Sequence, residues 1–294
     1  MKWRLIPLFL CLCCLCAGCS TNSSQSPSDS ASIYIQNKGS DTIVNLALAW
    51  AERYQTVRPK VRISVTGGGS GTGITSLING TVDIANASRA IKSEEISAAE
   101  ANGIEPVEHV IARDAIAVIV NPENPVSELT LDQISQIYRG AISNWQEVGG
   151  EDRPIVRLSR ETNSGTHVYF LEEVVRLGNK NDKAIFSPLT LLLPSSEGII
   201  SEVRDNPNAI GYDGLGYVTS EVKVIGISSG LGKPYVMPSV ETVNDKSYPI
   251  ARDLYMYSKK GANQTILDYM QWILTAEAQQ IVRELGFVPI VVVP

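Results

Sequence analysis

The sequence predicts an α/β protein with two lobes, each a mainly parallel sheet flanked by helices, and with a ligand bound in the cleft between them. Short β-branched runs alternate with helix-like segments, which is the pattern of a parallel sheet covered by helices. This alternation occurs in two successive cycles along the chain. The chain of 294 residues is long enough for one large domain or for two lobes.

The N-terminus predicts a bacterial lipoprotein signal. Lys2 and Arg4 precede an apolar run that ends at Cys19 and is too short for a comfortable membrane span. "CAGCS" resembles a lipobox, so we expect residues 1–18 to be a signal peptide and Cys19 to be lipidated, although Cys16 stands where Leu is usual. An ordinary signal peptide or an uncleaved anchor is the alternative. Residues 19–31 are Ser-rich and predict a flexible tether.

All five cysteines lie in the N-terminal run, so the body has no disulfide and no cysteine-based metal site. The formal net charge of the whole chain is −6. Loss of residues 1–18 removes Lys2 and Arg4 and no acidic residue, which leaves 23 basic against 31 acidic residues and a net charge of −8. This acidity, without a Lys/Arg-rich stripe, argues against nucleic-acid binding. It does not exclude an anionic ligand, because salt screens diffuse charge within about 10 Å.

The first cycle runs from residue 32 to about residue 120. Its expected strands are 32–36, 61–67, 82–88 and 114–120, and its expected helices are 42–55, 73–80 and 93–103. The second cycle has an expected strand at 154–159, a helix at 166–178, a Gly-rich turn and strand at 208–218, a strand at 248–258 and one long helix at 264–286. We expect crossings between lobes near 111–118 and 248–254. Lobe 1 would comprise residues 32–112 plus 252–294, and lobe 2 residues 113–251.

Three loops of similar chemistry lie between an expected strand and an expected helix. They are "GSDT" (Gly39–Thr42), "GGGSGTG" (Gly67–Gly73) and "RETNSGT" (Arg160–Thr166). Each offers hydroxyls and the free N–H groups of a helix N-terminus, which together suit an anion. A fourth candidate is Ser88–Arg89, directly after a strand. Any one loop alone predicts no more than helix capping, and Arg89 alone predicts a surface ion pair.

The loops occur at the carboxyl ends of successive strands, where open α/β sheets bind ligands. They match neither a dinucleotide fingerprint, a Walker A loop nor a nucleophile elbow. The two histidines, His109 and His167, do not form a catalytic pattern with the serines. The Arg160 fork suits phosphate-like oxygens. The combination therefore indicates a small tetrahedral oxyanion held without a metal or a covalent bond.

Taken together, these motifs resemble those of a known protein family. The chain is similar to the phosphate-binding proteins of bacterial ABC importers, from residue 33 to residue 294, and the motifs recur in order: "GSDT", "WAERY", "GGGSGTGI", "GTVDIANASR", "DAIAVIV", "LTLDQISQIYRGAISNWQEVGG", "RETNSGT", "NAIGYDGLGYV", "YPIARDLYMY" and "LGFVPI". The resemblance implies a two-lobed periplasmic-binding-protein fold of type II that closes on phosphate and delivers it to a membrane permease.

The resemblance also implies which residues bind phosphate. By motif they are Ser40, Asp41, Thr42, Ser70, Gly71, Thr72, Ser88, Arg89, Arg160, Ser164, Gly165 and Thr166. Better-known members carry Asp where this chain has Arg89, and that Asp accepts the proton of hydrogen phosphate, which helps to exclude sulfate. A carboxylate facing sulfate would be an unpaired buried charge. We expect Asp41, or as a second choice Glu161, to accept the proton here.

The sequence thus predicts a monomeric, lipid-anchored phosphate-binding protein that faces the periplasm or the cell exterior and docks on the membrane subunits of an ABC permease. It predicts no enzyme activity, no cofactor and no metal site. Sulfate, molybdate or a phosphonate is the alternative ligand. A phosphate-ester hydrolase is the alternative from another class, but the sequence supplies no activated nucleophile or cluster of metal ligands.

Overall fold

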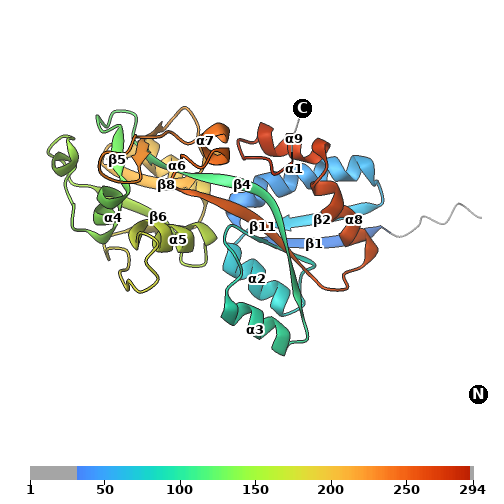
Figure 1. The fold of residues 1–294 in the computed structure, drawn as a ribbon. Helices are drawn as coiled ribbons and strands as arrows, with labels where there is room; N and C mark the ends of the chain where they lie inside the picture. Colours follow the sequence, from blue (N-terminus) through green and yellow to red (C-terminus); the bar gives the residue numbers. More distant parts are fainter. Residues whose placement is uncertain (1–31, 292–294) are drawn as a thin grey trace, which may run out of the picture. The chain divides into compact units, whose positions relative to one another are not determined.

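The structure is a computed structural model that describes residues 32–291. The expected signal peptide, Cys19 and the tether lie outside these residues. Figure 1 shows the arrangement of its elements. In chain order they are β1 (Ile33–Gly39), α1 (Asp41–Val57), β2 (Val61–Thr66), α2 (Ser70–Ile78), β3 (Ile84–Ala87), α3 (Ser93–Ala101), β4 (Pro106–Val120), β5 (Glu128–Thr130), α4 (Leu131–Arg139), β6 (Val156–Arg160), α5 (Gly165–Phe170), β7 (Leu191–Leu193), α6 (Ser196–Asp205), β8 (Ala209–Gly214), β9 (Lys223–Val224), β10 (Gly226–Ser228), α7 (Val240–Asn244), β11 (Ala251–Lys259), α8 (Gln264–Ile273) and α9 (Ala276–Glu284).

The main sheet has the strand order β2-β1-β3-β11-β4-β8-β6-β7, and β9 pairs with β4 beside this path. The strands β2, β1 and β3 are parallel to one another, and so are β8, β6 and β7. The two parallel groups are joined by β11 and β4, which are antiparallel to each other and to their outer neighbours. The sequence therefore predicts the parallel groups correctly, and the antiparallel pair lies between them.

The long antiparallel pair β4/β11 runs through both halves of the sheet (Figure 1). Its register joins Ala251 to Ala115 at one end and Lys259 to Pro106 at the other. The continuous apolar run 115–120 in β4 is buried, as expected of a strand covered on both faces. The strand also begins eight residues earlier than the sequence predicts, because 106–113 pair with β11 even though most of these residues are only partly buried or are exposed.

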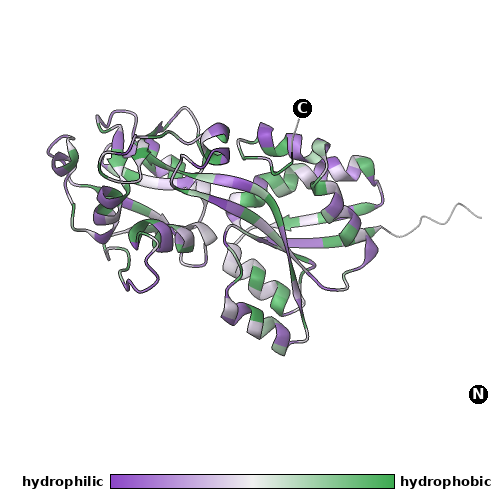
Figure 2. Cartoon of the chain, in the orientation of Figure 1, coloured by the Kyte–Doolittle hydropathy of each residue, from purple (hydrophilic) through white to green (hydrophobic). Residues whose placement is uncertain are grey.

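The buried side chains form separate cores in the two halves. Two clusters draw on residues 35–112 and 254–287, and include Trp50 of α1 and Tyr257 of β11. The other two draw on residues 115–250, with Val288 added, and include Trp145 and Tyr212. The helices pack their apolar faces on these cores, and Figure 2 shows hydrophobic and hydrophilic residues alternating along α2 and α3. This segregation supports lobe boundaries near residues 112 and 252, which stay a prediction.

The prediction of one long helix at residues 264–286 is wrong. The chain forms α8 and then α9, and the break falls at Leu274 and Thr275. The hydroxyl of Thr275 accepts a hydrogen bond from the backbone N–H of Ala278, so Thr275 is the N-cap of a new helix. Apolar periodicity continues across the break, and for that reason periodicity alone does not reveal it.

The helix expected at residues 166–178 is present but changes its winding. It begins as α5 and continues as a π-helical segment at Leu171–Val175. Such segments inside α-helices occur frequently at functional sites. Here the N-terminus of α5 carries Ser164, Gly165 and Thr166, the end of the "RETNSGT" loop.

Candidate functional site

Three loops with hydroxyls and helix N-termini meet in the structure. Ser40 precedes α1 at the end of β1, the loop at 67–69 precedes α2 at the end of β2, and the loop at 161–164 precedes α5 at the end of β6. The loops contact one another although they come from both parallel strand groups. The backbone N–H of Gly71 donates to the carbonyl of Asn163 over 3.0 Å. The side-chain amide of Asn163 donates to the carbonyl of Gly68 over 2.9 Å.

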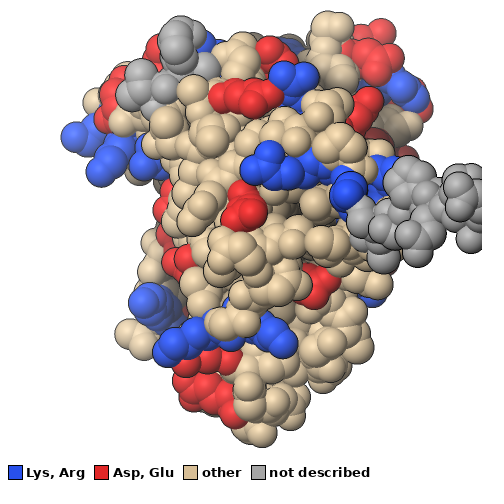
Figure 3. All heavy atoms as spheres, turned by 90° about the vertical axis from the view of Figure 1, so that its right-hand side faces the viewer, with Lys and Arg blue, Asp and Glu red and all other residues tan. Residues whose placement is uncertain are grey.

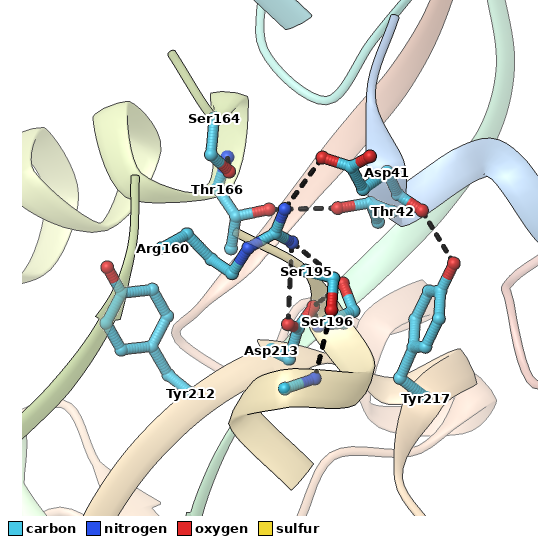
Figure 4. Close-up of polar contacts among 12 residues, drawn as sticks. Asp41, Thr42, Arg160, Ser164, Thr166, Ser195, Ser196, Tyr212, Asp213 and Tyr217 are labelled. Atoms are coloured by element: carbon cyan, nitrogen blue, oxygen red, sulfur yellow. Dashed lines mark hydrogen bonds and ion pairs between the residues drawn. The ribbon is translucent and has the colours of Figure 1, made fainter. Parts of the chain in front are cut away.

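Arg160 is a central cation of this site (Figure 4). Its side chain is buried, and Nη2 lies 2.7 Å from Oδ2 of Asp41. Nη1 donates to the Ser196 hydroxyl over 2.8 Å and lies 3.8 Å from Oδ2 of Asp213. The ion pair between Arg160 and Asp41 therefore joins the first loop to the third.

Asp41 has a second contact, because its Oδ1 accepts the backbone N–H of Gly68 over 2.9 Å. The backbone carbonyl of the same residue accepts the Tyr217 hydroxyl over 2.6 Å. Asp41 thus lies where the three loops meet. Glu161, the second choice for a proton acceptor, is exposed.

The predicted hydroxyls form two contact pairs. Thr42 Oγ1 and Thr166 Oγ1 lie 2.9 Å apart, in a contact between the first and third loops (Figure 4). Ser70 Oγ and Ser88 Oγ lie 3.2 Å apart, and Ser70 Oγ also accepts the Ser88 backbone N–H. All four residues are buried.

Gly165 lies against the second of these pairs. A Cβ atom on Gly165 would overlap the hydroxyls of both Ser70 and Ser88. The glycine therefore lets the N-terminus of α5 approach the loops of the other half of the sheet. Ser164, just before it, caps α5 by accepting the backbone N–H of Thr166 over 3.2 Å. That bond leaves the hydroxyl proton of Ser164 available for a ligand.

The remaining predicted residues are placed less centrally. Ser40 is buried and is the N-cap of α1 without a side-chain capping bond. Thr72 is half-buried in the first turn of α2, and its side chain lies beside Gly68. No hydrogen bond among the described residues joins the Thr72 hydroxyl to the other predicted side chains, so its role stays a prediction.

Arg89 has an ion-pair partner of its own. Its Nη1 and Nη2 atoms lie 2.8 and 2.6 Å from the two carboxylate oxygens of Glu95 in α3. The structure therefore places Arg89 in an ion pair, but the side chain is only 9% exposed and its Nη2 lies near Gly71. Arg89 remains beside the loops that the sequence predicts.

Buried titratable groups beside the site have shifted pKa values. Burial raises the pKa of Asp114 to about 6, against the opposing effect of the Arg252 guanidinium. Burial also raises the pKa of Asp213, against the opposing effect of Arg160. Burial lowers the pKa of His167, whose Nδ1 lies 2.9 Å from the carbonyl oxygen of Arg160, so this ring favours its neutral form.

Sequence reasoning missed several residues of this site. They are Asn163, Ser196, Asp213, Tyr217, Asp114 and Arg252. Asp114 and Arg252 carried a usable signal, because each is a charged residue inside a strand that otherwise reads as buried. Ser196 and Asp213 carried none, since a serine at a helix start and an aspartate in a Gly-rich segment are ordinary.

Two kinds of feature are absent from residues 32–291. No helix in that range is both long and apolar enough to cross a bilayer. No group of three or more His, Cys, Asp or Glu side chains in the same range is placed to hold a metal ion.

Comparison with known proteins places the chain in a family. A model of the PBP superfamily domain matches residues 24–277. The phosphate-binding protein PstS of Pseudomonas aeruginosa is 30% identical over 273 residues, which cover 87% of this chain and 83% of that protein. PstS of Bacillus subtilis is 30% identical and covers 91% of this chain and 86% of that protein.

Solved structures agree with these relatives. A putative phosphate ABC transporter substrate-binding protein from Clostridium perfringens, solved with bound phosphate, is 34% identical with a TM-score of 0.78, and the match covers 88% of this chain and all of that one. An ABC-type phosphate transport receptor from Vibrio cholerae is 28% identical with a TM-score of 0.69, over 86% of this chain and 99% of that one. The chain belongs to the PBP superfamily and, within it, to the PstS-type phosphate-binding proteins.

Proposed function

We propose that the protein binds inorganic phosphate in the cleft where the three loops meet and serves as the substrate-binding protein of an ABC importer. The observation that carries this proposal is the meeting of the three loops that precede α1, α2 and α5, with Arg160 paired to Asp41 and Thr42 in contact with Thr166. Backbone N–H groups, hydroxyl donors and an arginine fork are the groups that bind a tetrahedral oxyanion. Relatives named as phosphate-binding proteins support the choice of phosphate.

Two unpaired donors support an anionic ligand. Arg89 Nε and Arg160 Nε are both buried and have no hydrogen-bond partner among the described residues. A buried donor without a partner costs about 1–3 kcal/mol, so an oxyanion that reaches either group recovers part of that free energy. The proposed contacts are the twelve predicted residues, with Arg160, Ser164 and Thr166 on one side and Asp41, Thr42 and Ser70 on the other.

We propose further that residues 32–112 with 252–294 and residues 113–251 act as two lobes that close on the ligand. The contacts from Asn163 to Gly68 and from Tyr217 to Asp41 would then be contacts of the closed form. Both pairs join one proposed lobe to the other. Phosphate would stabilise this form because it bonds to both lobes at once.

Lipid attachment at Cys19 and delivery to a permease complete the proposal. The sequence of residues 1–31 supports an anchored protein on the outer side of a membrane, with a tether that lets the body reach a permease. On the face in Figure 3, acidic and basic side chains lie in small groups among uncharged atoms. A role without catalysis fits relatives that are named as binding proteins, and we expect the protein to be a monomer.

Calorimetric titration of the protein lacking residues 1–19, stripped of ligand by unfolding and dialysis, tests the proposal. We expect tight one-to-one binding of phosphate and no heat with sulfate. Tight binding of sulfate or molybdate instead would reassign the ligand within the oxyanion class. No heat with any oxyanion would reduce the three loops to helix caps and refute the proposal.

A further inference from the structure

Arg252 is a buried arginine in β11, within the long strand pair that joins the two halves of the sheet. Its register partner in β4 is Asp114, and its Nη2 lies 2.9 Å from Oδ2 of that carboxylate. Nη1 donates to the backbone carbonyl of Ser88 over 2.9 Å. Only 2% of the Arg252 side chain is exposed, so the buried positive charge needs Asp114 and the Ser88 carbonyl to offset its lost hydration.

The same guanidinium reaches the hydroxyls of two different loops. Nη2 lies 3.0 Å from Oγ1 of Thr166 and 3.5 Å from Oγ1 of Thr42. One arginine thus contacts the first turn of α1, the first turn of α5 and the residue that follows β3. It does so at the point where those two threonines contact each other.

The direction of these hydrogen bonds determines what the threonines can do. A guanidinium has donors only, and the two N–H groups of Nη2 suit Asp114 Oδ2 at 2.9 Å and Thr166 Oγ1 at 3.0 Å. The Thr166 oxygen therefore accepts toward Arg252, and Thr42 Oγ1 at 3.5 Å shares one of these donors. Each hydroxyl proton must then point elsewhere. One proton can occupy the contact between the threonines, and the other remains to be donated to an oxyanion. A positive charge beside the two oxygens also strengthens such a donated bond.

We propose that Arg252, held by Asp114, is a positioning residue for the oxyanion: it orients the Thr42 and Thr166 hydroxyls as donors and links the two loops that carry them. This inference rests on the proposed phosphate-binding function. It assigns Arg252 an action on the ligand through the threonines, and its effect on affinity therefore depends on Thr166.

The strand pair supplies a matched control. Arg113 and Asp253 are the neighbours of Asp114 and Arg252 and form the adjacent cross-strand ion pair, with Nε of Arg113 3.3 Å from Oδ1 of Asp253. Their side chains are 45% and 41% exposed, whereas those of the inner pair are buried. The Arg113→Met variant removes an arginine from the same ladder without touching the loops.

The test is a double-mutant cycle read by phosphate titration. Arg252→Met is expected to weaken phosphate binding by at least about tenfold, and Arg113→Met to leave it unchanged. Thr166→Val is expected to cost clearly less affinity in the Arg252→Met background than in the wild type, because the hydroxyl is no longer oriented. A purely structural role of Arg252 would give additive costs.

Arg252→Lys completes the set and serves if the methionine variant does not fold. A lysine keeps the charge but lacks the fork, so we expect an affinity between those of the wild type and of Arg252→Met, and incomplete coupling to Thr166. Wild-type affinity in either Arg252 variant, or additive costs with Thr166→Val, would overturn the inference. Absence of phosphate binding by the wild type would instead refute the proposed function, and this inference with it.

Discussion

The guanidinium of Arg160 is buried between carboxylates from distant parts of the chain. Asp41 lies on one side of it and Asp213 on the other. The sequence indicates Arg160 because it ends a strand and begins a loop with hydroxyls. It does not indicate the two carboxylates as partners, since they are 119 and 53 residues away and no local pattern connects them.

The first prediction concerns Arg160 itself. Arg160→Met is expected to weaken phosphate binding by at least about 100-fold, because each lost charge-assisted hydrogen bond is worth about 1.5–3 kcal/mol. Calorimetric titration measures the loss. Arg153→Met is the control, since Arg153 forms an ion pair with Glu151 outside the site. A folded Arg160→Met protein with wild-type affinity would contradict the assignment.

Asp41 is the residue on which selectivity depends in this account. Asp41→Asn is expected to lower the ratio of phosphate to sulfate affinity by at least about tenfold, because the amide no longer penalises an anion without a proton. The ratio matters because loss of the pair with Arg160 affects both anions. Glu161→Gln is the matched control, and a ratio that changes there but not in Asp41→Asn would make Glu161 the proton acceptor.

Asp114 predicts a pH dependence of stability. Its pKa is about 6 in the folded protein, above its ordinary value of 3.8, so the folded state holds the proton between these values. The stability from this group is therefore fully present below pH 3.8 and declines as the pH rises toward 6, by about 2–3 kcal/mol. The difference in free energy of unfolding between wild type and Asp114→Asn should fall over that range in urea titrations.

A constant difference between the two proteins from pH 4 to pH 7 would refute that prediction. Asp253→Asn is the matched control, because Asp253 lies in the exposed ion pair of the same ladder.

At the scale of elements, the loops depend on close approach as much as on their hydroxyls. Gly69 has a φ of 88°, and a Cβ on it would lie 2.8 Å from the carbonyl oxygen of Asn163 in the opposing loop. The glycine thus serves both the turn and the contact between loops. The sequence suggests the turn, but only the structure reveals the neighbour.

Gly69→Ala is expected to weaken phosphate binding by about tenfold, because closing the loops then costs free energy. Gly103→Ala is the matched control. Gly103 has a φ of 72°, and a Cβ atom there would have nothing within 4 Å. An alanine at this position therefore adds backbone strain without a close contact. Both variants should lose about 1–2 kcal/mol of stability, and equal phosphate affinities would show that the Asn163 contact does not matter for binding.

Elements also show where sequence reasoning ends. The capped loops and amphipathic helices were predictable from turn residues and periodicity. The break between α8 and α9 was not, because the apolar face continues through Leu274 while Thr275 starts a new helix. The first half of β4 was missed as well, because Glu108, His109 and Arg113 interrupt its apolar residues and make it resemble a surface segment.

At the scale of the whole molecule, the chain builds two cores on one sheet and joins them through β4 and β11. The order of cycles in the sequence predicts two parallel groups. It does not predict that the joining strands carry Asp114 and Arg252 into the site, since that depends on the register of two segments 138 residues apart. The candidate site thus lies where β4 and β11 connect the two parallel strand groups.

The most direct test of the account is a crystal structure of the protein lacking residues 1–19, grown with phosphate. We expect phosphate between the loops, bonded to Arg160, to the N-terminus of α5 and to the Thr42 and Ser70 loops. The alternative place is a cavity of about 810 Å³, whose charged lining residues are Arg89, Lys92, Lys180, Arg252, Glu94, Glu172, Glu173 and Asp253. Phosphate found only in that cavity, or bound nowhere, would contradict the central claim.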